Sequence, residues 1–283
     1  MYKILAKEEL APRIKKMWVE APRVARQAKP GHFIIIRLHE RGERIPLTIA
    51  DMDPERGAIM MVFQEMGKTT EELGSYRVGD ALADVLGPLG KIVPPRRVGT
   101  VLCVGGGVGV APIYPRAREL CQVGNRVVAV VGSRCKDLLI MQKEMEEACH
   151  EVHYCTDDGS FGHHGLVTDL LPQLIELERP AEVLAIGPVP MMRAVAQVTR
   201  QYNVPTIVSL NAMMVDGTGM CGACRVTVGG EVRFTCVDGP EFDGHQVDFA
   251  QLASRLRQFA EEERLALQRY HERKEGCQCQ TNG

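Results

Sequence analysis

The stretch "TVLCVGGGVGVAP" (residues 100–112) decides the fold of the second half of the chain. An apolar run of strand length ends in three glycines, and the helical stretch "VAPIYPRARELCQVG" follows. Glycines at such a junction let the backbone approach a pyrophosphate, whose charge the amides at a helix start favour. The loop departs from the G-x-G-x-x-G pattern, because the third glycine position is Val110. Taken alone, it fits a nucleotide loop or a plain glycine-rich turn.

Strands and helices alternate along the chain from this junction onward. After it come the strands "NRVVAVVGSR", "EVHYCTDD" and "EVLAIGP" and the helices "KDLLIMQKEMEEAC", "GLVTDLLPQLIEL" and "VPMMRAVAQVTRQY". Strands that alternate with helices of this length are typical of a parallel, doubly wound sheet. The sequence therefore predicts a nucleotide-binding α/β domain over residues 99–205.

Residues 1–98 have a different texture. Short apolar runs such as "HFIIIRL", "GAIMMVFQEM" and "DALADVLGPLG" are separated by turn residues, which favours a small antiparallel barrel. "KIVPPRRVG" marks a boundary near residue 98 with two prolines and a glycine. The predicted fold class is therefore multi-domain, β followed by α/β.

The chain after residue 205 is predicted to form two further parts. Residues 206–247 form a cysteine-bearing segment, and residues 248–283 read as one long helix with a frayed tail. Asp248 is a candidate helix cap, and a regular seam is predicted to pack on the body of the chain or on a partner subunit. The seam consists of Phe249, Leu252, Leu256 and Phe259. In the tail, Cys277 and Cys279 are weaker candidates for metal binding.

Composition excludes some classes of function. A net charge of −2 over 283 residues gives no basic excess to neutralise phosphates, which argues against nucleic acid as a partner. The first residues have no apolar core like that of a signal peptide, and no run approaches the roughly 20 apolar residues of a membrane span. We therefore expect a cytoplasmic protein that does not enter a membrane. Five scattered cysteines are expected to be free thiols: Cys103, Cys121, Cys135, Cys149 and Cys155.

Three further cysteines lie in "MMVDGTGMCGACRVTVGGEVRFTC" (residues 213–236). Cys221 and Cys224 form a Cys-x-x-Cys turn that can bring two thiolates onto one metal, and a hairpin would return Cys236 beside them. Zinc would need a fourth ligand, for which His245 is a candidate. A plant-type [2Fe–2S] loop has the spacing C-x4-C-x2-C, and its first position falls on Asp216. Asp216 is thus a candidate iron ligand or an ordinary Asp-Gly turn residue.

Three segments of the α/β half resemble the ferredoxin–NADP reductase superfamily. "GGGVGVAP" is similar to its pyridine-nucleotide loop, "TDDGSFGHHG" to its second nucleotide loop, and "IGPVPMM" to its loop near the nicotinamide. The family's fold is a flavin-binding barrel followed by this kind of α/β domain. The resemblance implies that NAD(H) contacts Gly105, Gly106, Gly107, Val108, Gly109, Asp157, Asp158, Gly159, Gly187, Pro188 and Met191.

Two segments of the barrel half resemble the flavin contacts of one branch of this superfamily. "RIPLT" looks like its Arg-x-Pro-Leu-Ser/Thr segment, and "VFQEMGKTTEEL" like the segment written Gly-Lys-Gly-Thr. Thr69 replaces the second glycine, which puts close backbone approach in doubt, while Thr70 keeps a hydroxyl donor. The implied FAD contacts are Arg44, Pro46, Leu47, Thr48, Val62, Phe63, Gln64, Gly67, Thr69 and Thr70.

The cysteine loop narrows the resemblance further. The electron-transfer subunit of dihydroorotate dehydrogenase carries C-G-x-G-x-C-x-x-C, where this chain reads "DGTGMCGAC". The aspartate resembles the small (alpha) subunit of the NADH-dependent reduced ferredoxin:NADP oxidoreductase, a family also named beta subunit of sulfide dehydrogenase. In that family the [2Fe–2S] cluster has one aspartate and three cysteine ligands, which implies the ligands Asp216, Cys221, Cys224 and Cys236.

These resemblances imply an oxidoreductase subunit that contains FAD and a [2Fe–2S] cluster. NADH would reduce FAD, and electrons would pass singly through the cluster to a larger iron–sulfur flavoprotein. That heterodimer would couple ferredoxin to NADP(H) in electron bifurcation. One alternative is the electron-transfer subunit of dihydroorotate dehydrogenase, and another is a zinc-stabilised nucleotide-binding module without redox turnover. The choice between NAD and NADP stays open, because Arg134 could meet a 2′-phosphate or be a solvated arginine.

Overall fold

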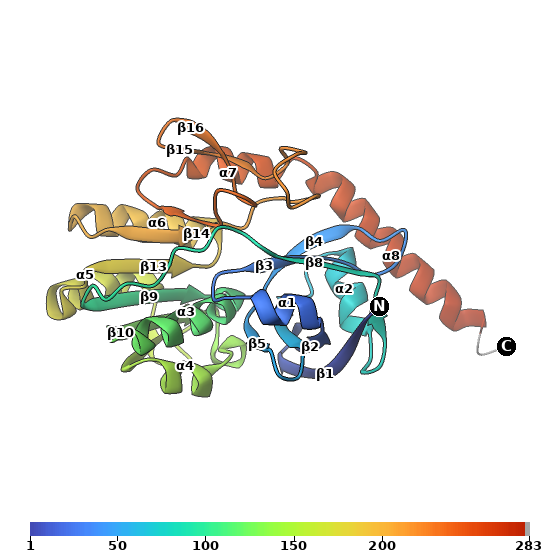
Figure 1. The fold of residues 1–283 in the computed structure, drawn as a ribbon, viewed down its shortest axis with the longest axis horizontal. Coiled ribbons are helices and arrows are strands. Elements are labelled where there is room, and N and C mark those ends of the chain that lie inside the picture. Colours follow the sequence, from blue (N-terminus) through green and yellow to red (C-terminus); the bar gives the residue numbers. More distant parts are fainter. Residues whose placement is uncertain (281–283) are drawn as a thin grey trace.

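The computed structural model describes the backbone of residues 1–280 and the side chains of residues 1–274. The candidate metal ligands Cys277 and Cys279 therefore lie outside the described side chains. The chain forms a barrel, a larger sheet covered by helices, and an irregular arm above both, and one helix extends away from the body (Figure 1). Within the described residues, no helix combines the length and apolarity that crossing a membrane requires.

The N-terminal part is an antiparallel barrel of two sheets, as predicted. One sheet has the order β5-β6-β2-β1-β7 and the other β4-β3-β8. Its strands are β1 (Tyr2–Ala11), β2 (Ile14–Glu20), β3 (Phe33–Arg37), β4 (Arg44–Thr48), β5 (Asp51–Asp53), β6 (Ala58–Gln64), β7 (Ala81–Leu82) and β8 (Asp84–Leu89). Two short helices complete it, α1 (Pro22–Gln27) and α2 (Lys68–Ser75).

Strand β3 is buried on both faces. Ile34 and Ile36 point into the barrel core, whereas Phe33 and Ile35 belong to the core that continues into the rest of the molecule. This alternation follows from the two-residue period of a strand. This strand of the barrel therefore packs on the barrel core with one face and on the core shared with the rest of the molecule with the other.

The α/β part is a seven-stranded sheet with the order β12-β11-β10-β9-β13-β14-β17, in which only β17 is antiparallel. This confirms the predicted doubly wound sheet. Its strands are β9 (Thr100–Gly106), β10 (Arg126–Ser133), β11 (Glu151–Thr156), β12 (His163–His164), β13 (Glu182–Ile186), β14 (Thr206–Ser209) and β17 (Glu241–Asp243). Both β14 and β17 come from the segment predicted for the cysteine-bearing part, so the sheet extends past residue 205.

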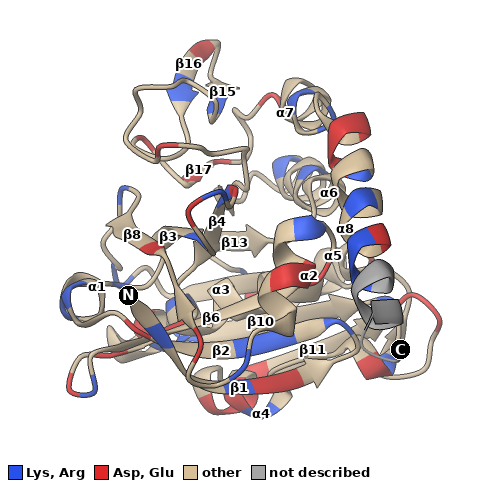
Figure 2. Ribbon diagram, turned by 90° about the vertical axis from the view of Figure 1, so that its right-hand side faces the viewer, with Lys and Arg blue, Asp and Glu red and all other residues tan. Residues whose placement is uncertain are grey.

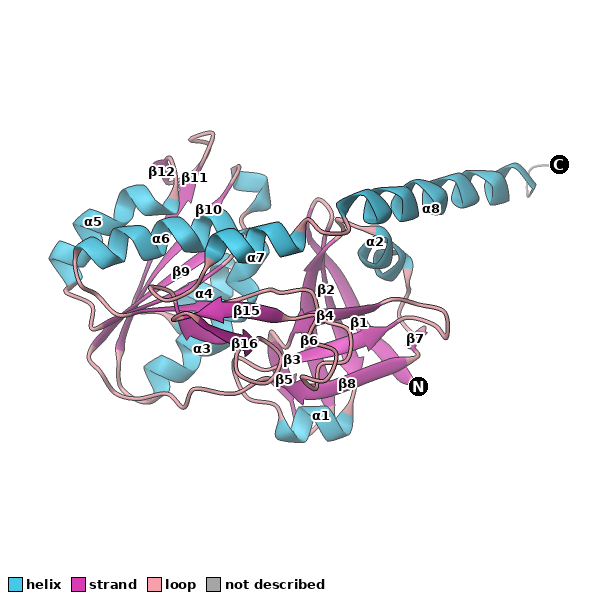
Figure 3. Cartoon of the chain, turned by 90° about the horizontal axis from the view of Figure 1, so that it is seen from above, coloured by secondary structure: helices cyan, strands magenta, loops and turns pink. Residues whose placement is uncertain are grey.

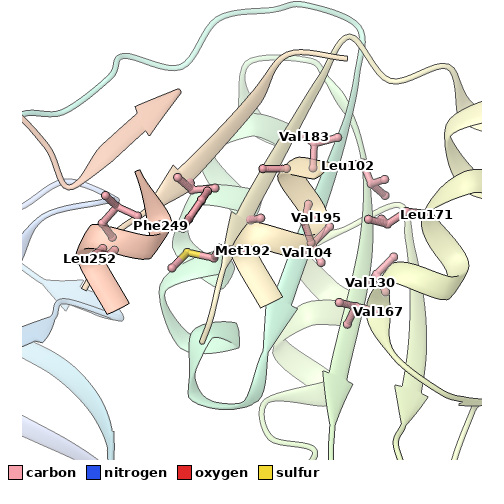
Figure 4. Close-up of a cluster of buried hydrophobic side chains, with 14 of the residues drawn as sticks. Leu102, Val104, Val130, Val167, Leu171, Val183, Met192, Val195, Phe249 and Leu252 are labelled. Carbon is pink, nitrogen blue, oxygen red and sulfur yellow. The ribbon is translucent and has the colours of Figure 1, made fainter. Parts of the chain in front are cut away.

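Helices cover both faces of this sheet. The residues of β9 alternate: Leu102 and Val104 face α5 and α6, whereas Val101 and Cys103 face α3 and α4. Figure 4 shows the first of these layers, in which Val167 and Leu171 of α5 and Met192 and Val195 of α6 meet the strands. The helices are α3 (Val110–Gln122), α4 (Gln142–Ala148), α5 (Val167–Glu178) and α6 (Val189–Gln201).

The helix predicted over residues 136–149 is shorter in the structure. A single 3-10 turn, η2 (Lys136–Leu138), comes first, and α4 begins only at Gln142. Met141, the residue before it, has a left-handed backbone with φ of 55°, which interrupts a continuous helix. Leu139, Ile140 and Met141 are buried under α3, so tertiary packing overrides the helical propensity of this stretch.

The arm, defined as residues 210–240, connects β14 to β17. Its only regular elements are the two strands of a hairpin, β15 (Arg225–Val228) and β16 (Glu231–Phe234). The turns before the hairpin use glycines with positive φ, namely Gly217, Gly219 and Gly222. Such turns are accessible to glycine at little steric cost, which explains why this glycine-rich stretch makes a loop.

The C-terminal part contains two helices, α7 (Phe249–Leu256) and α8 (Ala260–Gln280), so the prediction of one continuous helix is wrong. Asp248 caps α7 as predicted, because its carboxylate accepts from the Gln251 amide at 2.9 Å. Phe249 and Leu252 join the core, whereas Phe259 lies in the turn between the helices and is 42% exposed. The predicted seam therefore packs on the chain's own body through α7.

Helix α8 leaves the body after that turn (Figure 3). Three glutamates follow Ala260 in its first turn, and charged residues continue along the helix (Figure 2). It meets α2, where His271 Nε2 lies 2.6 Å from Glu71 Oε2. The barrel thus supports the extended helix at the element that follows the predicted flavin strand β6.

Candidate functional site

The glycine loop lies at the point where the sheet changes direction. Strand β9 has β10 on one side and β13 on the other, and the loop continues from its carboxyl end through a 3-10 turn, η1 (Gly107–Gly109), into α3. Ligands of open α/β sheets bind in the crevice outside the carboxyl ends at such a switch point. The predicted nucleotide loop therefore occupies the expected place.

The loop predicted to lie near the nicotinamide packs directly against the glycine loop. A side chain at Gly109 would collide with the carbonyl oxygen of Ile186, and a Cβ at Gly187 would lie 2.8 Å from Met191 Cε. A side chain at Gly106 would collide with the Met191 sulfur. Glycine is thus required here by close approach of two loops, whereas Gly107 has φ of 56° and open space around it. The open position is the one at which a ligand can approach the backbone.

The second nucleotide loop follows β11 at the same edge of the sheet. The amides of Asp157 and Asp158 donate to the carbonyls of Ser133, the last residue of β10, and Arg134, which follows it. The Ser160 hydroxyl donates to Asp158 Oδ1 at 2.6 Å, and this bond together with the Ser160 amide lowers the pKa of Asp158. Asp158 therefore shapes the loop, and the three predicted nucleotide segments follow the carboxyl ends of β9, β11 and β13 at one edge of the sheet.

The flavin segment "RIPLT" is strand β4. It pairs with β3 in the register Leu47 to Ile34 and Pro46 to Ile35. Arg44 is exposed at its start, and the other residues of the strand are partly buried. A strand with one side on a core and a cation at its end fits a ring-and-phosphate ligand such as FAD.

The second flavin segment spans the end of β6 and the start of α2. Val62 packs in the core shared with α3, and Phe63 is buried inside the barrel, so the Phe63 side chain does not face a surface site. Gln64 is partly buried. Strand β6 contacts the 3-10 turn η1, which places the predicted flavin strand against the glycine loop.

The hydroxyls expected to meet flavin are already bonded within the chain. Thr70 Oγ1 donates to the Gly67 carbonyl at 3.0 Å and accepts from the Gly67 amide at 3.1 Å, which caps α2. Thr69 is 5% exposed and its hydroxyl donates to Glu43. Glu43 also receives Lys68 Nζ at 3.3 Å. The expectation that Thr70 offers a free donor is therefore not met in this structure, because the helix start uses it.

The arm lies on the barrel next to the flavin strand. A Cβ on Gly217 would be 2.7 Å from both Ile35 Cδ1 and Leu89 Cδ1. Ile35 is the residue that pairs with Pro46 of β4. The sequence reasoning missed this contact, although the uninterrupted apolar run "FIIIR" is a signal that β3 is covered on both faces.

The structure brings the predicted cluster ligands together in pairs. Cys224 and Cys236 are buried, and their Sγ atoms lie 3.1 Å apart as free thiols. Asp216 accepts the Thr218 amide at 2.8 Å and the Cys221 amide at 2.7 Å, while Cys221 itself is exposed. Among the described side chains, no set of three or more His, Cys, Asp or Glu is gathered closely enough to hold a metal as it stands.

Metal binding would have to change the protonation state of the buried cysteines but not that of Asp216. The Thr218 amide, followed by the Cys221 amide, lowers the pKa of Asp216 despite a smaller opposing effect of burial. Burial, with Cys224 next to it, raises the pKa of Cys236 to about 12. A metal cation favours the thiolate form of such cysteines. The donor set of one ionised carboxylate and neighbouring buried thiols therefore fits an iron–sulfur group.

His245, the candidate fourth ligand of a zinc site, lies elsewhere. Its Nε2 is 3.0 Å from the Thr199 hydroxyl on α6, and burial lowers its pKa. His245 therefore contacts helix α6 of the α/β part. The zinc alternative thus loses the ligand on which it depended.

Two families match parts of the chain. The family described as the iron–sulfur cluster binding domain of dihydroorotate dehydrogenase B matches residues 211–248, which span the arm and β17. The oxidoreductase NAD-binding domain family matches residues 103–197, from the end of β9 into α6. FAD, a [2Fe–2S] cluster and NAD(H), the predicted cofactors, are the cofactors that the comparisons as a whole support.

Relatives that match most of the chain agree with these two families. The dihydroorotate dehydrogenase B (NAD(+)) electron transfer subunit homolog of Thermotoga maritima is 48% identical over 94% of this chain and 94% of its own length. The dihydroorotate dehydrogenase B (NAD(+)) electron transfer subunit of Shouchella clausii is 34% identical over 84% of this chain and 94% of its own.

Solved structures show the same relationship. A chain of the NADH-dependent reduced ferredoxin-NADP oxidoreductase, described for flavin-based electron bifurcation, has a TM-score of 0.92 and 45% identity. The match covers 95% of this chain and 98% of that one. A cytochrome P450 reductase of Amycolatopsis shares the fold, with a TM-score of 0.61 at 18% identity over 72% of this chain and 66% of its own. The chain therefore belongs to the ferredoxin–NADP reductase superfamily and, within it, to the family of iron–sulfur electron-transfer subunits that includes the small subunit of the NADH-dependent reduced ferredoxin:NADP oxidoreductase.

Proposed function

We propose that this chain is the NAD(H)-oxidising small subunit of an electron-bifurcating oxidoreductase, whose larger iron–sulfur flavoprotein subunit couples ferredoxin to NADP(H). The similarity to the bifurcating enzyme over nearly the whole of both chains supports this assignment. Asp216 at the first position of the C-x4-C-x2-C spacing supports it as well. FAD would convert the two-electron chemistry of NADH into single electrons for the cluster.

One observation carries the proposal: the predicted flavin region contacts the predicted nucleotide loop on one side and the predicted cluster arm on the other. Strand β6 contacts the glycine loop at η1, and Gly217 of the arm packs on Ile35, the partner of Pro46 in the flavin strand. The nucleotide crevice and the arm therefore lie on two sides of the same barrel. Gly217 leaves no room for a side chain between the arm and strands β3 and β8, so these two regions pack closely there.

The exposed face of the arm supports a partner subunit. Met220 is 88% exposed, and Val215 and Val237 are exposed beside it, around the exposed Cys221. Val237 contacts the arm loop at Gly219, since a Cβ there would lie 3.0 Å from Val237 Cγ2. Apolar side chains gathered on an otherwise polar surface mark interaction sites. We propose that the larger subunit docks on this face and receives electrons there.

Anaerobic titration of the isolated chain with NADH tests the proposal. The flavin absorption is expected to bleach, and the electron paramagnetic resonance signal of a reduced [2Fe–2S] cluster is expected to follow. A colourless protein, or flavin that NADH does not bleach, would refute the electron route. Because this chain lacks cysteines for further clusters, it is expected to show no ferredoxin-dependent NADP reduction by itself.

A second candidate is the electron-transfer subunit of a dihydroorotate dehydrogenase. The names of the relatives and the family that matches the arm favour it. Both candidates share the cofactors and differ in the partner. Affinity purification from the native source separates them: a large iron–sulfur flavoprotein supports bifurcation, and a dihydroorotate-oxidising flavoprotein supports the second candidate.

A further inference from the structure

A buried ion pair lies where α3 meets the return of the arm into the sheet. Arg116 of α3 and Glu241 of β17 have side chains only 4% and 3% exposed. Arg116 Nη2 donates to Glu241 Oε2 at 3.2 Å, and Arg116 Nε lies 2.9 Å from Glu241 Oε1 as an ion-pair contact without hydrogen-bond geometry. Glu119 adds a contact of 2.6 Å to Arg116 Nη1. The pair takes no part in the cofactor contacts described above.

The barrel and the α/β part touch this pair, and the arm reaches it through the stretch of chain just before Glu241. Gly31, which precedes β3 of the barrel, is so close that a Cβ would lie 3.3 Å from Glu241 Oε1 and 3.7 Å from Arg116 Cδ. The stretch just before Glu241 is also tied down, because the Lys91 amide donates to the Gly239 carbonyl at 2.6 Å and the Leu210 amide to the Pro240 carbonyl at 2.9 Å. The pair therefore sits at a three-way junction of barrel, α/β part and arm.

Stability alone does not explain such a pair. Burial raises the pKa of Glu241 and of Glu119, with Arg116 opposing it in both, so the carboxylates are costly to keep ionised here. Buried ion pairs can often be replaced by apolar side chains without loss of stability. What an apolar pair does not supply is a fixed direction, because the charged hydrogen bond and the ion-pair contact beside it constrain the orientation of both groups.

We propose that Arg116 and Glu241 are positioning residues that fix the arm relative to the flavin barrel, so that the Cys236 end of the arm stays at a set distance from the flavin strand. Only four residues separate Cys236 from Glu241, so a displacement of Glu241 would be passed along a short stretch of chain to this predicted cluster ligand. The electron-transfer consequence rests on the proposed function, whereas the positional consequence does not.

The double variant Arg116→Met/Glu241→Leu tests the proposal, because it removes both charges and keeps the volume. In stopped-flow reduction by NADH, flavin bleaching is expected to stay within about twofold of wild type, while cluster reduction slows by about tenfold as the geometry loosens. Arg118→Met/Asp51→Leu is the matched control. That pair joins α3 to the barrel at 2.6 Å without touching the arm, so both phases are expected to be unchanged. Cluster reduction at the wild-type rate in the iron-loaded double variant would overturn the proposal.

Hydrogen exchange gives a reading that does not depend on electron transfer. The amides of Lys91 and Leu210 are expected to exchange at least about tenfold faster in the double variant, while the amides of β9 and β10 keep their protection. Unchanged exchange at both amides would refute the positional role even if NADH never reduces the flavin. If the double variant does not fold, Glu241→Gln is measured instead; it keeps the shape and removes the charge, and wild-type exchange there would equally refute the proposal.

Discussion

The seven-stranded sheet and the arm are both largely buried at their centres, but they are held in different ways. In the sheet, Val104 and Val130 are fully buried among side chains of the same kind, in strands of regular register. In the arm, glycine turns, amide-to-carboxylate bonds and a thiol pair hold a mostly irregular backbone. Hydrophobic periodicity thus defines the scaffold, whereas the spacing of a few polar and sulfur groups defines the chemistry.

The largest effect is expected in the arm. Cys224→Ser should remove the cluster, because a buried thiolate ligand is replaced by a poor donor for iron. Iron content is expected to fall to near zero, with NADH bleaching of the flavin retained. Cys135→Ser, outside the arm, is the control and should keep its iron. Full iron content in the Cys224 variant would contradict the ligand assignment.

The sheet should respond to loss of packing and not to loss of chemistry. Leu102→Ala at a fully buried site is expected to lower the free energy of unfolding by about 2–5 kcal/mol. Leu177→Ala at a site that is 70% exposed is expected to change it by less than about 0.5 kcal/mol. Denaturant unfolding measures both. Equal effects at the two sites would show that the sheet is not the main source of stability.

Asp216→Ala distinguishes a ligand from a turn residue. The variant is expected to change the electron paramagnetic resonance signal and to lose part of the iron, because the carboxylate stands at a ligand position. Asp238→Ala is the matched control, since its carboxylate also accepts a backbone amide in the arm, that of Phe234 at 2.7 Å. If the Asp216 variant keeps the wild-type signal and iron content, the carboxylate is only a turn residue.

The smallest effect concerns the pH dependence of stability at His32, the residue before β3. Burial lowers the pKa of His32 below 6.5, and its Nδ1 accepts the Lys29 amide at 2.9 Å, which requires that nitrogen to be unprotonated. The unfolded chain therefore takes up this proton more readily, so His32 should reduce stability as the pH falls below 6.5. Comparing unfolding of wild type and His32→Asn at about pH 7.5 and about pH 5.5 measures this contribution. An identical pH dependence in the variant would exclude it.

Much of the scaffold could be predicted because its signals are local. The alternation in residues 99–205 gave the strands and helices of the doubly wound sheet, and the cap at Asp248 was visible as a residue type before an apolar stretch. The break between α7 and α8 at Arg257–Phe259 was missed, because the charged sequence there has no glycine or proline to end a helix. The residues of the break are exposed, so no burial pattern marks it in the sequence either.

The candidate site was predictable by residue type and less so by contact. The spacing of Asp216 to Cys224 identified a candidate ligand loop, but only coordinates show that Gly217 lies on Ile35. Thr69 and Thr70 were expected to face flavin, and they are bonded to Glu43 and to the start of α2. A single sequence shows which polar groups are present, but it does not show which of them are already hydrogen-bonded to other residues of the chain.

The contact of Gly217 with Ile35 and Leu89 limits how this module can be transplanted. Residues 210–240 would not seat on another flavin barrel by grafting alone, because the arm has too few regular hydrogen bonds to hold its own shape. The recipient barrel would need matching aliphatic side chains on the outer faces of two adjacent strands. The arm residue that packs on them would have to be glycine, because a side chain would not fit there. To transfer the predicted cluster-binding arm to another flavoprotein, strands β3 and β8 should therefore be transferred with it.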